Sequence, residues 1–222
     1  MIEYLEKHPL FSGIDKDDIK KLLNCLTINK KSYRKDEYII KIGSDINDIG
    51  LPLTGRIFME KEDYSGNHYF YTEIQQDYLF GEVFICPDSC SSTVNYRAIT
   101  DCTILFIKYD TILHTCKNNC RCHQILIGNL INLIAFKSRC LMDKIEIISK
   151  KSIRERIMTY LSLLSQKQHS HVVTSPLNHK ELAGFLCVNR SSMLRELNYM
   201  KEANLIDFNR NTYTISRSEP NP

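Results

Sequence analysis

The stretch LNHKELAGFLCVNRSSMLRELNYMKEANLI, residues 177–206, holds two short amphipathic patterns separated by a turn. Asn178 is placed to cap a first helix, and Glu181, three residues later, completes a capping box. Asn189 is placed to cap a second helix, which Asn204 can end in a left-handed conformation. The spacing therefore predicts two helices in quick succession.

Each predicted helix has one apolar face, and the two faces can pack against each other. The turn falls at Cys187-Val188, and the small side chain of Ala183 permits a close helix crossing. The other inward residues are Leu182, Leu186, Met193, Leu194, Leu197 and Met200. Beyond them, Leu205-Ile206 and Tyr213–Ile215 flank the polar turn Asn209–Asn211 and predict a hairpin. Together these elements predict a winged helix-turn-helix.

Polar residues gather at the exposed start of the second helix, where a recognition helix points into the major groove of DNA. An arginine there can donate two hydrogen bonds to guanine, and a serine can reach a base edge or a phosphate. We therefore predict a DNA interface made of Asn178, Asn189, Arg190, Ser191, Ser192, Arg195 and, on the hairpin turn, Arg210.

Composition and charge agree with this interpretation. The 222 residues are 43% hydrophobic and 25% charged, which is typical of a soluble globular protein. Residues 151–222 carry ten Lys and Arg against six Asp and Glu, whereas the first 150 residues carry nineteen against twenty. This modest excess suits a site-specific DNA reader better than a general nucleic-acid coat. The acidic, proline-containing N-terminus is a poor secretory signal, and no long uninterrupted apolar stretch is present, so we expect a cytoplasmic protein without a membrane span.

Upstream of the winged region the pattern changes from strands to a long helix. Residues 2–26 predict short helices, and residues 31–107 predict a sandwich or jelly roll, a β-roll. Its strand candidates are Tyr38–Lys41, Arg56–Lys61, Tyr69–Ile74, Tyr96–Ala98 and Thr103–Lys108. The fold class is therefore α+β, with a β-roll sensor domain at 1–110, a dimerisation helix at 111–150 and the winged helix-turn-helix at 151–222.

The predicted long helix has two apolar columns. Its seven-residue repeat consists of Ile127, Ile134, Leu141 and Ile148, and the neighbouring column consists of Leu126, Leu133, Cys140 and Ile147. So wide a stripe predicts one contact with the roll and a second with a partner helix; a merely amphipathic surface helix is the alternative. Lys137 and Lys144 limit the contact to a short two-helix seam. A capping box at Ser152 and Glu155 predicts a new helix after a hinge near 149–152.

The order of roll, long helix and winged helix-turn-helix resembles the superfamily of the cyclic AMP receptor protein and the fumarate–nitrate reduction regulator. The segment from Glu181 to Ile206 carries the specific part of the resemblance. The resemblance implies a bacterial transcription regulator, not an enzyme. It further implies a homodimer that binds palindromic DNA and a ligand that turns the long helices, with RNA polymerase as a possible partner. Arg190 and Arg195 are then base or phosphate contacts.

The roll departs from the pattern of nucleotide-binding members. By the resemblance, its effector pocket is formed by Gly81, Glu82, Ser92 and Thr93. Such members neutralise the ligand's phosphate with an arginine followed by a hydroxyl residue, but Ser92 stands at the arginine position here. Arg97 comes too late in the sequence, and Asp88 makes the loop less suitable for an anion. We therefore expect a signal other than cyclic AMP, although a serine-rich loop is a weaker anion site.

Nine cysteines are many for a chain without an export signal. Five of them, Cys86, Cys90, Cys116, Cys120 and Cys122, could approach one pocket and hold zinc, an iron–sulfur cluster or a redox pair. Their spacing matches no strong metal-binding template. Cysteine is also common as a buried filler, and we expect Cys25, Cys102, Cys140 and Cys187 to be core residues.

Two other functions are open. A jelly-roll metalloenzyme needs several histidines and a carboxylate inside the roll, where the sequence offers only His68. An effector-independent regulator would use the roll only as a scaffold for dimerisation. An enclosed cavity in the roll would favour a ligand, whereas an interior filled by the roll's own tyrosines and phenylalanines would favour the scaffold.

Overall fold

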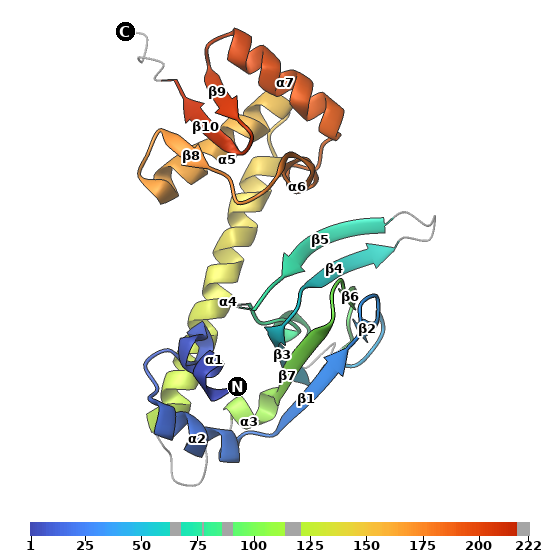
Figure 1. Ribbon diagram of the computed structural model, residues 1–222, viewed down its shortest axis with the longest axis vertical. Helices are drawn as coiled ribbons and strands as arrows, with labels where there is room; N and C mark the ends of the chain where they lie inside the picture. Colours follow the sequence, from blue (N-terminus) through green and yellow to red (C-terminus); the bar gives the residue numbers. More distant parts are fainter. Residues whose placement is uncertain (63–67, 77, 86–90, 114–120, 217–222) are drawn as a thin grey trace. The chain divides into compact units, whose positions relative to one another are not determined.

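The computed structural model describes residues 1–62, 68–76, 78–85, 91–113 and 121–216. The chain forms two compact units, residues 1–135 and 136–222, and the long helix α4 (Arg121–Ile148) contributes to both. The α+β class and the order of roll, long helix and helix-turn-helix are as the sequence predicts (Figure 1).

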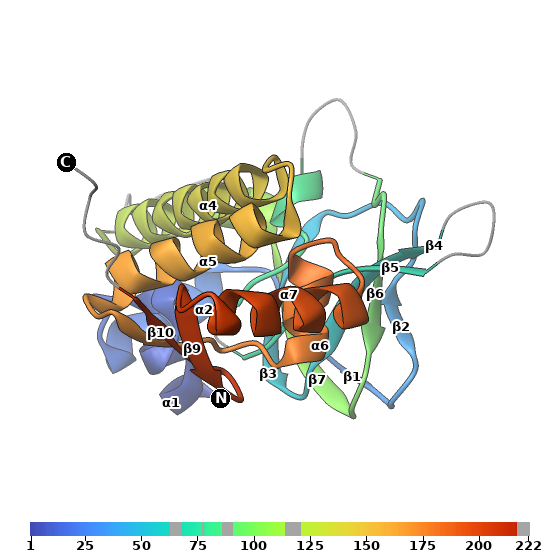
Figure 2. The ribbon, with the colours of Figure 1, turned by 90° about the horizontal axis from the view of Figure 1, so that it is seen from above.

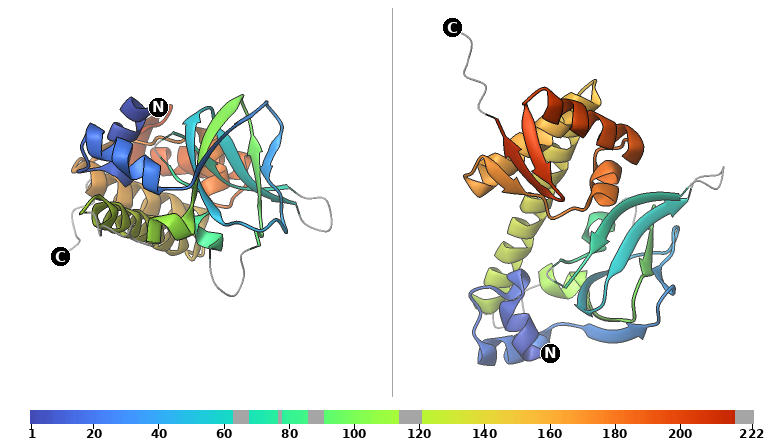
Figure 3. Two further views of the ribbon diagram at one scale, coloured as in Figure 1. Left: turned by 90° about the horizontal axis from the view of Figure 1, so that it is seen from below. Right: turned by 45° about the horizontal axis from the view of Figure 1, so that its top comes forward.

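Three short elements begin the first unit: α1 (Ile2–Lys7), the 3-10 helix η1 (Pro9–Phe11) and α2 (Lys16–Cys25). Asp15 starts α2 because its carboxylate accepts a hydrogen bond from the Asp18 amide. Their apolar residues pack against the start of α4, beside which they lie in Figure 3. Asn129 of α4 secures this contact, since its Nδ2 donates to the carbonyl oxygens of Leu10, at 3.0 Å, and Ser12, at 2.8 Å.

The roll consists of two antiparallel sheets. The three-stranded sheet has the order β1 (Ile28–Tyr33), β7 (Cys102–Lys108), β3 (Asp48–Thr54). The four-stranded sheet has the order β2 (Tyr38–Ile40), β6 (Asn95–Ala98), β4 (Ile57–Glu62), β5 (His68–Ile74). Strands β1 and β3 were not among the predicted strands. The first is polar and mostly exposed, and the second contains Gly50 and Pro52, which both disfavour strands.

The helical region begins with α3 (Tyr109–Leu113) and continues with α4. Leu126 and Leu130 of α4 are buried in the first unit, and Ile147 is buried in the second. By length and composition α4 is the one helix among the described residues that could cross a membrane, which is weak evidence. Lys137 and Arg139 stand near its middle, where charges are costly in hydrocarbon.

The second unit is built on helix α5 (Ile153–Gln168), which opens with the predicted capping box of Ser152 and Glu155. The remaining elements are β8 (Val172–Thr174), α6 (His179–Phe185), α7 (Arg190–Glu202), β9 (Ile206–Asn209) and β10 (Thr212–Ile215). The strands form one sheet in the order β8-β10-β9. The predicted inward residues of α6 and α7 are buried in its core, apart from the half-buried Leu194.

The prediction for the four core cysteines is right for only one of them. Cys102 is buried, whereas Cys25, Cys140 and Cys187 are exposed. Cysteine packs well in a core, but Cys25 and Cys187 lie on outer positions whose inward neighbours are larger aliphatic residues, and Cys140 lies in the part of α4, residues 131–146, where no side chain is buried.

Candidate nucleic-acid interface

The recognition helix α7 is fixed at its start by Asn189. The Asn189 Oδ1 accepts hydrogen bonds from the Ser191 amide at 2.9 Å and the Ser191 hydroxyl at 2.7 Å. Helix α6 begins in the same way, because the Asn178 Oδ1 accepts from the amides of Lys180 and Glu181. The carbonyl oxygens of both predicted asparagines therefore serve the helix caps.

The turn between α6 and α7 requires an unusual backbone conformation. Cys187 lies in the left-handed region with φ of 55°, a region that favours glycine. The Val188 amide donates to the Ala183 carbonyl oxygen at 3.0 Å and closes the end of α6. This turn sets the direction in which α7 leaves α6.

The first turn and a half of α7 presents the predicted contacts to solvent. Arg190, Ser191 and Arg195 are exposed and Ser192 is half-buried, whereas Met193 and Leu197 on the opposite face are fully buried. The guanidinium of Arg195 stays near its own helix, with Nε 3.4 Å from the Ser191 carbonyl oxygen. Positive side chains and free amides at a helix N-terminus suit phosphate, and the arginines can read bases.

The sequence analysis did not single out one exposed aromatic residue on α7. Tyr199 is 57% exposed and lies four residues after Arg195, so the two share one face of the helix. The i, i+4 spacing of an exposed tyrosine and the predicted contact residue is the signal that could have found it.

The hairpin β9–β10 forms the predicted wing next to α7 (Figure 2). Arg210 is exposed at its tip with φ of 53°. The neighbouring Asn211 anchors the tip, since its Nδ2 donates to the Ser175 carbonyl oxygen at 2.8 Å and its own carbonyl oxygen accepts from the Ser175 amide. A basic residue on an anchored tip is suited to a phosphate contact.

Three aromatic side chains pack against one another in the described part of the roll's core. Phe80 and Tyr96 are each 1% exposed, with ring centroids 5.0 Å apart, and Phe106 meets Phe80 edge-on at 6.2 Å. Phe80 lies so close to Gly50 that a Cβ atom on Gly50 would stand 2.3 Å from its ring. Burial and the nearby carboxylate of Glu82 raise the pKa of the Tyr96 hydroxyl, which lies close to the Gly81 backbone. Tyr96 thus reaches the Gly81-Glu82 pair from within the roll.

The other two predicted pocket residues differ in exposure. Ser92 is buried, and its hydroxyl donates to the Val94 carbonyl oxygen at 2.6 Å, while Thr93 is exposed. Two hollows in this unit measure about 340 and 510 Å³. Neither is lined by any of the four predicted pocket residues.

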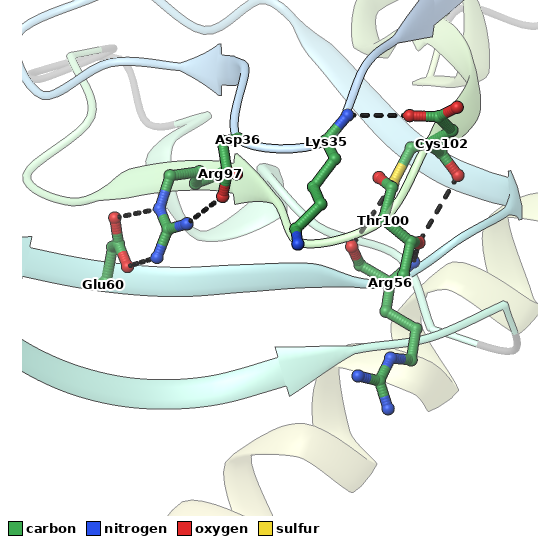
Figure 4. A network of polar contacts seen from close by, with 8 residues as sticks. Lys35, Asp36, Arg56, Glu60, Arg97, Thr100 and Cys102 are labelled. Atoms are coloured by element: carbon green, nitrogen blue, oxygen red, sulfur yellow. Dashed lines mark hydrogen bonds and ion pairs between the residues drawn. The ribbon is translucent and has the colours of Figure 1, made fainter.

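Arg97 is engaged in a local ion-pair network on the four-stranded sheet (Figure 4). Its Nε and Nη2 donate to the two carboxylate oxygens of Glu60 at 2.8 and 2.9 Å, and its Nη1 donates to Asp36 at 2.9 Å. The hydrogen bond to Glu60 raises the pKa of Arg97 further, so the group stays charged. With three of its donors directed at carboxylates, Arg97 is not placed to neutralise a ligand phosphate.

Comparisons with known proteins agree with both halves of this geometry. The model of the cyclic nucleotide-binding domain matches residues 30–119, and the model of the Crp-like helix-turn-helix domain matches residues 155–219. The chain belongs to the Crp family of transcription regulators. Comparison with curated proteins gives no significant match.

Solved structures of Crp-family proteins share the fold. The catabolite activator protein of Thermus thermophilus is 19% identical, with 94% of this chain and 93% of that chain covered and a TM-score of 0.54. A CooA mutant from Carboxydothermus hydrogenoformans is 16% identical, with 89% and 86% covered and a TM-score of 0.62. CprK complexed with OCPA is 15% identical, with 90% and 91% covered and a TM-score of 0.63.

Of the five cysteines predicted as metal ligands, only Cys122 lies among the residues that the structure describes. Cys86, Cys90, Cys116 and Cys120 lie outside the described residues, as does the side chain of His68. Cys122 is half-buried on α4, and the described residues contain no group of three or more metal-binding side chains. Cys102 is held as a thiol, because burial raises its pKa and its Sγ donates to the carbonyl oxygens of Thr100 and Arg56 (Figure 4).

The burial of Tyr96 in the roll leads to a prediction about stability. Tyr96→Ala removes a buried ring from between the two sheets, and we expect it to lower the free energy of unfolding by about 3–5 kcal/mol. Chemical denaturation monitored by circular dichroism measures the loss. Tyr71→Ala, which changes an exposed tyrosine of β5, is the control and should change the free energy by less than about 0.5 kcal/mol. Equal effects of the two substitutions would contradict a roll packed around Tyr96.

Proposed function

We propose that this Crp-family protein is a homodimeric, cytoplasmic regulator that reads a palindromic DNA site and does not respond to cyclic AMP. The observation that carries the DNA-binding part is the capped helix α7, which exposes Arg190, Ser191 and Arg195 on one face and buries the other. RNA polymerase is the further partner that a transcription regulator of this family implies.

The exposed side of α4 supports the homodimer. Apolar residues there remain outside both cores, among them Ile131 at 60%, Leu141 at 58% and Ile145 at 61% exposure. The predicted column adds Ile134, which is exposed, and Ile127 and Ile148, which are half-buried. With Ser138, these residues are spaced alternately by four and three along the helix, which is the repeat of a two-stranded coiled coil.

A palindromic operator follows from that dimer. Two copies related by a two-fold axis present their α7 helices to two half-sites of the same sequence on opposite strands. The half-site spacing is then set by how far apart α4 holds the two helices.

The contacts of Arg97, Ser92 and Tyr96 in the roll argue against cyclic AMP as the signal. A nucleotide phosphate enclosed in protein needs charge neutralisation, and Arg97 is occupied by Glu60 and Asp36. The Ser92 hydroxyl is bonded to the backbone of Val94, and Tyr96 is buried in the roll near Gly81. The same packing favours an effector-independent regulator as the second candidate function, with the roll serving as a scaffold for the dimer.

Arg195 tests the DNA-binding assignment. Arg195→Ala removes a base-reading guanidinium, and we expect a loss of about 1–3 kcal/mol in binding to a DNA site selected from random duplexes, with relaxed base preference at one position of each half-site. Fluorescence anisotropy at fixed salt measures it. Arg34→Ala, which removes the same charge from the roll, should leave the affinity unchanged. An equal loss on unrelated DNA would make Arg195 a phosphate contact.

Ile134 tests the dimer. Ile134→Asp places a charge in the apolar seam, and we expect the protein to become monomeric at micromolar concentration, measured by light scattering coupled to size exclusion. Cys140→Asp adds the same charge at an exposed position outside the seam and should leave the dimer intact. A dimer that survives Ile134→Asp removes this face of α4 from the interface.

A titration tests the exclusion of cyclic AMP. We expect isothermal titration of the protein with millimolar cyclic AMP to give no binding heat. A thermal melt with the same nucleotide should show no rise in melting temperature, because a ligand that binds only the folded state would raise that temperature. The same titration in the presence of the selected DNA site checks the DNA-bound form. Saturable binding with one nucleotide per chain would show that the roll opens around Tyr96.

A further inference from the structure

Arg156 binds three backbone carbonyl oxygens from two segments that lie far apart in the sequence. From its place on α5, its Nε donates to Lys150 at 3.0 Å. Its Nη1 donates to Leu186 at 3.1 Å and approaches the carbonyl oxygen of Cys187 at 3.4 Å. The side chain is half-buried, so these bonds are partly shielded from water.

The three acceptors belong to two chain segments that matter for DNA binding. Lys150 follows the last turn of α4, while Leu186 and Cys187 form the end of α6 and the turn that leads into α7. Carbonyl groups at helix C-termini lack intrahelical donors and carry partial negative charge. A planar guanidinium can bind several of them at once, whereas an ammonium group cannot reproduce this fixed fork.

Other contacts hold the end of α4 to the same helices. Ile147 is 1% exposed in the core that α6 and α7 share. The ammonium group of Lys144 lies 5.2 Å from the ring centre of Phe185 on α6, and Asp143 is paired with Lys167 of α5 at 2.7 Å. The segment at 149–152, predicted as a hinge, is therefore bridged on both sides.

We propose that Arg156 is a positioning residue that fixes the direction of the recognition helix relative to the end of α4. Arg156 then links the break between α4 and α5 to the turn at Cys187. This turn therefore moves together with the end of α4. This inference rests on the proposed function, because only a dimer joined along α4 converts that bracing into a defined distance between two recognition helices.

A purely structural role for Arg156 gives a different result. If its hydrogen bonds only stabilise the unit, substitution lowers the melting temperature and weakens all DNA sites alike. If Arg156 positions α7, the substituted protein tolerates half-site spacings that the wild type rejects. Discrimination between spacings is therefore the quantity to measure.

The experiment compares wild type, Arg156→Lys and Lys151→Ala on three duplexes. These are the site selected from random DNA by the wild type, the same site with one base pair inserted at its centre, and a single half-site. The insertion rotates one half-site by about 34° relative to the other. Arg156→Lys keeps the charge but loses the fork, and Lys151→Ala removes a charge from an exposed neighbouring residue.

We expect Arg156→Lys to bind the selected site about tenfold more weakly, the effect of losing hydrogen bonds from a charged donor. Its preference for that site over the lengthened one should fall by a similar factor, while half-site affinity stays within about twofold. Lys151→Ala should keep the wild-type preference. An unchanged spacing preference in Arg156→Lys, or a uniform loss on all three duplexes, would overturn the proposal.

Hydrogen exchange of the free proteins separates this inference from the proposed function. The Cys187 and Val188 amides donate to the carbonyl oxygens of Gly184 and Ala183, and we expect both to exchange at least about tenfold faster in Arg156→Lys than in Lys151→Ala. Equal exchange in the two variants would refute the bracing, whatever the DNA results. A wild type that selects no DNA site would refute the proposed function, while the exchange result would still decide on the brace.

Discussion

Helix α4 carries a single apolar stripe whose residues face different surroundings. Leu126 and Leu130 are buried with the N-terminal helices, and Ile147 is buried with the helix-turn-helix. An α-helix advances about 100° per residue, so residues at other positions in the stripe cannot face the same cores. Ile131, Leu141 and Ile145 therefore stay exposed, and their coiled-coil spacing suits a second copy of the same helix. In the proposed dimer, the helix pair that covers this seam also sets how the two recognition helices meet DNA.

The packing of the roll supports the proposal that this chain keeps the family fold without responding to cyclic AMP. The family relationship and the Gly81-Glu82 pair both suggest a nucleotide, yet Tyr96 reaches that pair from inside the roll. Tyr96 packs there against Phe80 as part of the roll's own core. The arginine that remains, Arg97, instead joins β6 to β4 through Glu60. The residues inside the roll thus stabilise the scaffold.

Local chemistry explains which features could be predicted from the sequence. The caps at Ser152, Asn178 and Asn189 and the left-handed Asn204 depend on neighbours within three residues, and all four are as predicted. Polar β1 and the glycine- and proline-containing β3 were missed, because their strand form depends on pairing with β7, which follows β3 in the sequence only after β4, β5 and β6 and lies still farther from β1. The packing around Tyr96 and the carbonyl contacts of Arg156 were beyond reach for the same reason: both join distant segments.

The packing around Tyr96 and the carbonyl contacts of Arg156 together limit how DNA binding can be regulated. The cluster of Phe80, Tyr96 and Phe106 joins the two sheets of the roll, and a close-packed cluster resists deformation. If Arg156 holds the end of α4 to the turn before α7, a displacement of α4 also displaces the recognition helix. If both hold, control of DNA binding depends on whether the α4 seam is occupied, and therefore on the concentration of the chain. The affinity of that seam, more than the affinity of the roll for any small molecule, then sets the protein concentration at which the regulator acts.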